Sequence, residues 1–151
     1  MRGNCPRCRT SLLAAALVLV LVPLAPAQGQ SYGNLDTSFE LSLNARQDPP
    51  LGIELAVATT TVYPCAGYQL SSSVRWNRDT LTVAVLGLRR PSPCVPMSSI
   101  ASARLFLGDL GDTTVVLCFT YRGNEDRYRM TFSGGEIRVV PLVRRFTAFR
   151  R

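Results

Sequence analysis

Short apolar segments with a period of two residues constrain the fold of this chain more than any other feature. From Phe39 to Asn44, the apolar Phe39, Leu41 and Leu43 alternate with polar residues. Such alternation turns one side of a β-strand toward a core and the other toward water. The pattern recurs at 53–62, 68–76, 80–88, 103–107, 115–121, 128–132 and 136–140. No stripe with a helical period interrupts this series before residue 142.

Turn-forming residues separate the alternating segments. Asp48-Pro49-Pro50 breaks the chain after the first segment, and Gly134-Gly135 is a strong signal for a tight hairpin. The loop from Arg89 to Pro96 contains three prolines, so we expect it to be irregular. Seven to eight short strands with regularly spaced turns predict an all-β domain over residues 37–141, built as a single antiparallel β-sandwich.

The first residues read as a secretory leader. Arg2, Arg7 and Arg9 precede an apolar run from Leu12 to Leu24, and Ala25 and Ala27 supply small residues at its exit. We expect an N-terminal signal helix within a signal peptide over residues 1–27, cleaved after Ala27, and then a polar linker over 28–36. The apolar run is shorter than the roughly 20 residues that span a bilayer, which favours cleavage over an uncleaved anchor. The mature chain is therefore expected to be secreted or periplasmic, with an N-terminally membrane-anchored form as the alternative.

Composition excludes several classes of catalytic site. All 17 basic residues are arginine, against 10 acidic residues, and the chain has no histidine. Removing the leader leaves 14 basic against 10 acidic residues, a net charge of +4. Without His or Lys the chain cannot form Ser-His-Asp, Cys-His or Ser-Lys sites, or a Schiff base. We therefore expect neither an enzyme nor a cofactor or metal, and a carboxylate-based hydrolase is the least favoured function.

Three of the five cysteines follow the leader. Cys5 and Cys8 form a C-x-x-C pair within the segment that is removed, so we assign them no redox or metal role. The remaining three predict one disulfide and one thiol in an oxidising compartment. We prefer Cys65 with Cys94, since each lies in a proline-bearing loop, and Cys65 with Cys118 is the alternative.

Cys65, Trp76 and Cys118 occur in an order that resembles an immunoglobulin-like domain. The segment Asp112–Cys118 also resembles that family's Asp-x-Gly/Ala-x-Tyr-x-Cys motif, although Val116 stands at the tyrosine and Thr114 at the small residue. The resemblance implies an immunoglobulin-like or fibronectin-type-III-like sandwich of the kind found in bacterial envelope proteins. It also implies a tryptophan packed near a Cys65–Cys118 bridge, and a role in binding or adhesion.

Arginines mark two candidate binding surfaces. Arg127, Arg129 and Arg138 alternate on two segments joined by Gly134-Gly135, which places them in a basic stripe suited to carboxylate or phosphate. The favoured alternative is an ordinary solvated strand face. The second surface is a basic-aromatic tail over residues 142–151, which carries Arg144, Arg145, Arg150 and Arg151.

As a helix, this tail would align Val143, Phe146 and Phe149 in one stripe suited to a membrane surface, an acidic polysaccharide or nucleic acid. The favoured interpretation is a frayed terminus whose aromatic side chains pack on the sandwich.

Four acidic residues form the remaining candidate site. Asp109, Asp112, Glu125 and Asp126 lie in two predicted turns, where loop oxygens can bind Ca²⁺ or paired carboxylates can hydrolyse a glycoside. Their spacing fits no calcium-loop template, so turn formation is the favoured role.

Taken together, these features predict a secreted or periplasmic, non-enzymatic module that binds a protein or glycan at the cell envelope. The alternative is an exported inhibitor or electrostatic binder of an anionic surface or polysaccharide, acting through its arginines. Nucleic acid is not an expected partner.

Overall fold

A computed structural model describes residues 38–46 and 48–150, so the predicted signal peptide, its cleavage site and the linker lie outside the described residues. The described residues form nine β-strands and no helix. The strands are β1 (Phe39–Arg46), β2 (Gly52–Cys65), β3 (Gln69–Asn77), β4 (Thr80–Arg89), β5 (Pro96–Gly108), β6 (Thr113–Tyr121), β7 (Asn124–Ser133), β8 (Glu136–Val143) and β9 (Thr147–Phe149).

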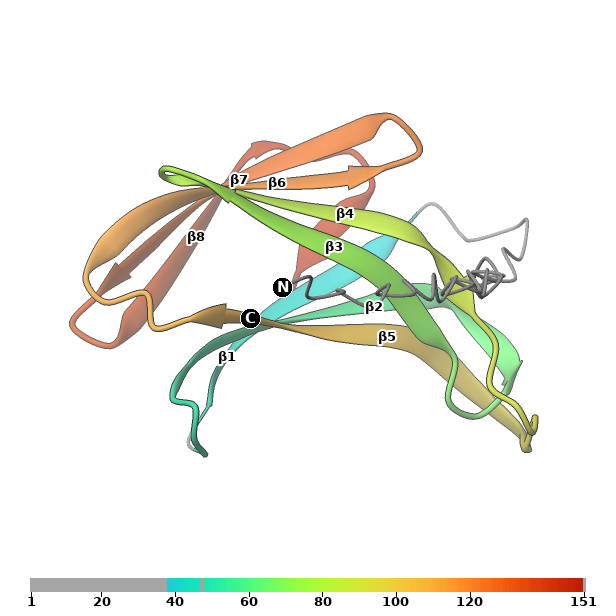
Figure 1. Cartoon of the computed structure of the whole chain (residues 1–151). Helices are drawn as coiled ribbons and strands as arrows, with labels where there is room; N and C mark the ends of the chain where they lie inside the picture. The colour runs from blue at the N-terminus through green and yellow to red at the C-terminus, as the bar shows by residue number, and fades with distance from the viewer. Residues whose placement is uncertain (1–37, 47, 151) are drawn as a thin grey trace, which may run out of the picture.

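All nine strands belong to one sheet, in the order β8-β7-β6-β4-β3-β5-β2-β1-β9. The all-β prediction is confirmed, but the strands number nine and not seven to eight, and they do not form a clean antiparallel sandwich. One sheet coils back on itself and nearly closes into a barrel, so that β3, β4, β6, β7 and β8 lie across from β1, β2 and β5 (Figure 1). Three neighbouring pairs, β4–β6, β1–β9 and β3–β5, are parallel. Period-two alternation gives each strand a buried face but does not say which strands pair, which explains the error.

Two-residue turns make the tight hairpins. Gly134 and Gly135 both have positive φ, at 57° and 81°, as the type I′ turn between β7 and β8 requires. Arg122 and Gly123 do the same between β6 and β7, with φ of 49° and 77°. This turn excludes Glu125 and Asp126, which the sequence placed in a turn, because Asn124 already pairs with Tyr121.

The inner face of the coiled sheet carries the core. Alternate residues such as Leu81, Val83, Leu117 and Phe119 are fully buried, as the sequence pattern predicts. Aromatic side chains fill the region beneath β1, where the ring of Phe39 contacts those of Phe119, Tyr121 and Phe146. Each large apolar side chain buried in this way contributes about 1.5–3 kcal/mol to folding.

The last described residues link the two edges of the sheet. β8 pairs with β7 at one edge, and after three residues the same segment continues as β9, which pairs in parallel with β1 at the other edge. The Phe39 amide donates to the Phe146 carbonyl (2.9 Å), and the Arg150 amide donates to that of Leu41 (2.8 Å). Residues 142–150 are therefore neither a helix nor a frayed end. Phe146 and Phe149 do pack against the core.

β3 and β5 pair only where Gln69 faces Ser102. Beyond this pair the two strands diverge (Figure 1), so that Ser71–Asn77 of β3 and Ala103–Gly108 of β5 each have a sheet neighbour on one side only. We call the space between these two free edges the seam.

Candidate functional site

The predicted basic stripe lies on the outer face of β7 and β8. Arg127 and Arg129 alternate on β7 with buried side chains, so both guanidinium groups stand on the solvent side. Arg138 of β8 pairs with Thr131, which makes it a diagonal neighbour of Arg129. Side chains in this diagonal relationship reach one another, because their Cα atoms are about 7–8 Å apart. We call Arg127, Arg129 and Arg138 the arginine face.

The three arginines differ in their electrostatic partners. Glu125, two residues away on the same face, accepts a hydrogen bond from Arg127 Nε and forms an ion pair with it. That hydrogen bond, followed by the charge of Glu125, raises the pKa of Arg127. Among the described residues, no acidic side chain forms an ion pair with Arg129 or Arg138. Two guanidinium groups on rigid strands are therefore available to an anion.

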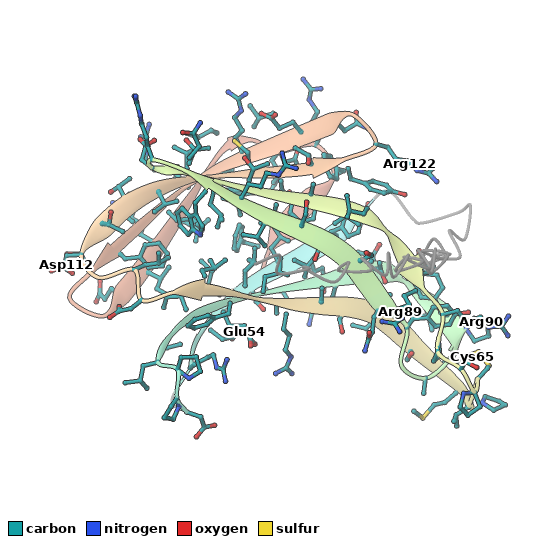
Figure 2. The ribbon with its side chains drawn as sticks, viewed as in Figure 1. Glu54, Cys65, Arg89, Arg90, Asp112 and Arg122 are labelled. Atoms are coloured by element: carbon teal, nitrogen blue, oxygen red, sulfur yellow. A yellow bond between two sulfur atoms is a disulfide. The ribbon has the colours of Figure 1, made fainter. Side chains whose placement is uncertain are left out.

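The neighbouring outer positions on β6 and β4 are uncharged. Val116 and Cys118 of β6 face Arg129 and Arg127, and Thr80 and Thr82 of β4 continue the same two rows. Side chains tipped with nitrogen project from this side of the sheet in Figure 2. The arginine face thus borders a small, uncharged surface on which an extended partner can lie.

The tail arginines divide between two places. Arg144 and Arg145 are exposed and follow Val143, which pairs with Arg127, so they extend the basic surface at the end of β8. Arg150 lies beside β1, where its guanidinium group forms a 2.6 Å ion pair with Glu40. Arg151 lies outside the described residues. The tail therefore adds two arginines to the surface, not four.

The four acidic candidates do not meet in one site. Asp109 and Asp112 precede β6 and Glu125 and Asp126 follow it, so the length of that strand, about 25 Å, separates them. Figure 2 shows Asp112 and Arg122 at opposite ends of the sheet. Asp112 accepts a 2.9 Å hydrogen bond from the Gly134 amide, and Asp109 accepts one from Gly111. Among residues 38–46 and 48–150, no group of three His, Cys, Asp or Glu residues is placed to hold a metal.

Asp126 has a role that the sequence prediction missed. Instead of forming a turn it lies on β7 and is completely buried. Its Oδ1 accepts the Arg145 amide (2.8 Å), and its Oδ2 accepts the Phe146 and Thr147 amides (3.0 and 2.8 Å) and the Thr147 hydroxyl (2.6 Å). The Tyr128 hydroxyl lies 2.7 Å from Thr147 Oγ1. A buried carboxylate thus holds the corner between β8 and β9. The sequence does carry a signal for this burial, because Asp126 is in phase with Tyr128, Met130 and Phe132 on the buried face of β7.

The structure joins Cys65 to Cys94, the pairing preferred from sequence. Cys118 is a free, half-buried thiol on the outer face of β6. Burial raises its pKa, and the nearby charge of Glu125 adds to the effect. Trp76 is the second-last residue of β3, and 44% of its surface is exposed. The bridge and the packed tryptophan that the immunoglobulin-like resemblance implies are therefore not formed by these residues.

Comparison of the chain with protein-family models, with curated proteins and with solved structures found no match. Within the described part of the chain, no helix is long and apolar enough to cross a membrane.

Proposed function

We propose that this chain is an exported, non-enzymatic binding module that recognises an anionic partner at the cell envelope through the arginine face. The observation that carries the proposal is the pair Arg129 and Arg138. They are diagonal neighbours on two hydrogen-bonded strands, and no acidic side chain of the described residues pairs with them. Guanidinium groups bind carboxylate, sulfate and phosphate through paired N–H donors.

An extended acidic polysaccharide suits this surface better than a small anion. The arginines are exposed on the outer face of two strands, and Arg144 and Arg145 extend the positive charge toward the end of β8. A polymer that carries repeated negative charges can contact several of these groups at once, which raises its affinity for the surface. A protein partner with an acidic surface is the second candidate.

Two features support the proposed location outside the cytoplasm. Residues 1–27 have the three parts of a secretory signal. The Cys65–Cys94 disulfide belongs to the kind of cross-link that persists in oxidising compartments. We also propose a relationship to immunoglobulin-like domains, for which the support is the all-β fold and the order of Cys65, Trp76 and Cys118.

Binding to an immobilised acidic polysaccharide, with polygalacturonate and heparin as separate probes, tests the proposed function. The double variant Arg129→Ser with Arg138→Ser should bind about tenfold more weakly and depend less on salt, because each lost guanidinium removes a screened charge contact. The double variant Arg46→Ser with Arg89→Ser is the matched control, since it removes the same charge far from the arginine face. If the two double variants weaken binding equally, or if the parent binds neither probe, the proposal is wrong.

A further inference from the structure

We propose that the seam between β3 and β5 is a second binding site, which accepts an extended peptide segment of a partner protein by strand addition. The segment would alternate apolar with acidic residues. This site is separate from the arginine face and does not depend on it.

The first argument is the exposure of side chains that face the core side of the sheet. On β5, Ala103 and Leu105 are half-buried, although Val57 and Leu55, their partners on β2, are 1% and 0% exposed. On β3, Val74 is half-buried and Trp76 is 44% exposed, whereas their partners on β4, Val83 and Leu81, are each 0% exposed. Burial is thus reduced at these positions on both strands that border the seam, while Leu107, further along β5, is 5% exposed. An added strand would cover these side chains.

The second argument comes from the backbone. The Ser102 amide donates to the Tyr68 carbonyl, so the Tyr68 carbonyl points toward β5. Backbone groups alternate in direction along a strand, which places those of Leu70, Ser72, Val74 and Trp76 on the seam side of β3. Asn77 and Thr80 pair across the two-residue turn of the β3–β4 hairpin. This pairing agrees with a strand in which the backbone groups of the odd-numbered residues face β4. A strand that enters the seam therefore meets a row of backbone donors and acceptors.

The seam also lacks two of the devices that protect sheet edges, which are proline and inward-pointing charge. Proline and inward-pointing charges commonly prevent edge strands from pairing. β8, at one end of the sheet order, contains Pro141, but residues 70–77 and 102–108 contain no proline. A cleft of about 520 Å³ lies where the two strands begin to separate, lined by Gln69–Ser72 and Ser102–Leu105.

Charge identifies the chemistry of the segment. Arg75 and Arg104 lie on the outer face of the two bordering strands, out of phase with the apolar side chains that face inward. Arg75 has no ion-pair partner among the described residues, and Arg104, whose side chain is 78% exposed, is 3.7 Å from Glu54. Arg75 lies six residues beyond Gln69, and Arg104 lies two residues beyond its partner Ser102. The two arginines are therefore offset by four residues, or about 13 Å along the seam. A segment with carboxylates on its outer side can reach both, while its apolar side chains cover Trp76 and Leu105.

Trp76 is the only tryptophan in the chain, so its fluorescence reports on the seam directly. The test titrates the protein with a peptide of about eight residues that alternates valine and glutamate, a length typical of a strand. We expect a saturable blue shift of the Trp76 emission, because the added strand removes the indole from water. A peptide of the same composition with its valines and glutamates in two blocks, and one with lysine in place of glutamate, should bind at least about tenfold more weakly.

Val74→Pro is the decisive variant. The Val74 amide faces the seam and not β4, so proline should preserve the β3–β4 ladder while it removes a donor from the seam. Val139→Pro is the matched control on β8: Val139 is also half-buried, and its amide faces away from β7, in phase with the native Pro141. The proposal predicts that Val74→Pro loses peptide binding about tenfold or more and that Val139→Pro keeps it.

Three results would overturn the proposal. They are no fluorescence shift in the parent, equal binding of the block peptide, or unchanged binding by a folded Val74→Pro variant. A blue shift that grows with protein concentration in the absence of peptide, together with a dimer mass, would identify a second copy of the chain as the occupant instead. Loss of binding by Arg75→Ser with Arg104→Ser, but not by Arg129→Ser with Arg138→Ser, separates this site from the arginine face.

Discussion

Replacement of Asp126 by asparagine tests how the sheet is closed. In the structure Oδ2 accepts three hydrogen bonds and Oδ1 accepts one. An asparagine can place its carbonyl oxygen at the Oδ2 position and keep the three bonds, but its amide group then faces the Arg145 amide, donor against donor. One bond is lost, and three bonds to a charged acceptor become bonds to a neutral one.

The size of the effect follows from these bonds. A hydrogen bond to a charged group contributes about 1.5–3 kcal/mol and one to a neutral group about 1 kcal/mol. Loss of the buried charge also removes its desolvation cost, which offsets part of the change. We expect Asp126→Asn to lower the free energy of unfolding by about 2–3 kcal/mol. Asp126→Ala should lower it by about 4–5 kcal/mol, because all four donors then lose their acceptor.

Urea unfolding followed by Trp76 fluorescence measures this free energy, and hydrogen exchange of the Phe39 and Arg150 amides reports the β1–β9 pairing separately. Asp112→Asn is the control, since Asp112 accepts one hydrogen bond in an exposed turn. This replacement should lower the free energy of unfolding by less than about 1 kcal/mol. Our account of the corner fails if Asp126→Asn unfolds within about 0.5 kcal/mol of the parent, or if Asp112→Asn costs as much.

Four further predictions concern the cysteines and two tyrosines. Replacing Cys65 and Cys94 by serine should lower the free energy of unfolding by about 3–4 kcal/mol, because the bridge closes a loop with a sequence separation of 29. Denaturation with and without reductant measures this loss, and an unchanged midpoint would contradict the prediction. Cys118 should react with iodoacetamide more slowly than free cysteine at pH 8, because burial raises the pKa of its thiol and lowers the thiolate fraction. Mass spectrometry across a pH series gives the rates, and a rate equal to that of free cysteine would refute the assignment. Tyr128→Phe should lower the free energy of unfolding by about 1 kcal/mol, because the hydrogen bond of the hydroxyl to Thr147 is lost. Tyr121→Phe should leave this free energy unchanged, because the buried Tyr121 hydroxyl has no hydrogen-bond partner in the described residues. Equal losses for the two variants in urea unfolding would argue against this difference. Burial also raises the pKa of Tyr128, so its neutral form stabilises the fold below about pH 10. That contribution is lost as the pH rises through the folded-state pKa. Tyr128→Phe should therefore weaken the loss of stability at alkaline pH.

The sequence predicted the strands better than their arrangement. Alternation located eight of the nine strands, because residues such as Phe119 and Met130 reveal a buried face through local pattern alone. β9 was missed because three residues carry too little periodicity, and its strand conformation depends on pairing with β1. The start of β5 was missed for a similar reason, since Pro96 appeared to belong to the preceding loop.

The candidate sites also divide into features that local sequence pattern predicts and features that depend on distant contacts. The arginine face was predictable because Arg127, Arg129 and Arg138 alternate across a hairpin with a clear Gly-Gly turn. The role of Asp126 was not, because its partners are backbone amides about 20 residues further along the chain and an aspartate near Gly123 looks like a turn residue. The seam was also hidden from local pattern, since Trp76 continues the apolar face of β3 and only the divergence from β5 exposes it.

The joining of β9 to β1 also determines when the barrel can form during folding. This pairing connects the first described strand to the last, so a growing chain cannot make it until nearly all of the domain has emerged. Loop-closure entropy opposes such distant contacts until the intervening strands have folded and brought the ends together. Strand β1 therefore remains an open edge until the final segment arrives. In the cell, the interval before that arrival is the period in which this domain most needs protection from aggregation.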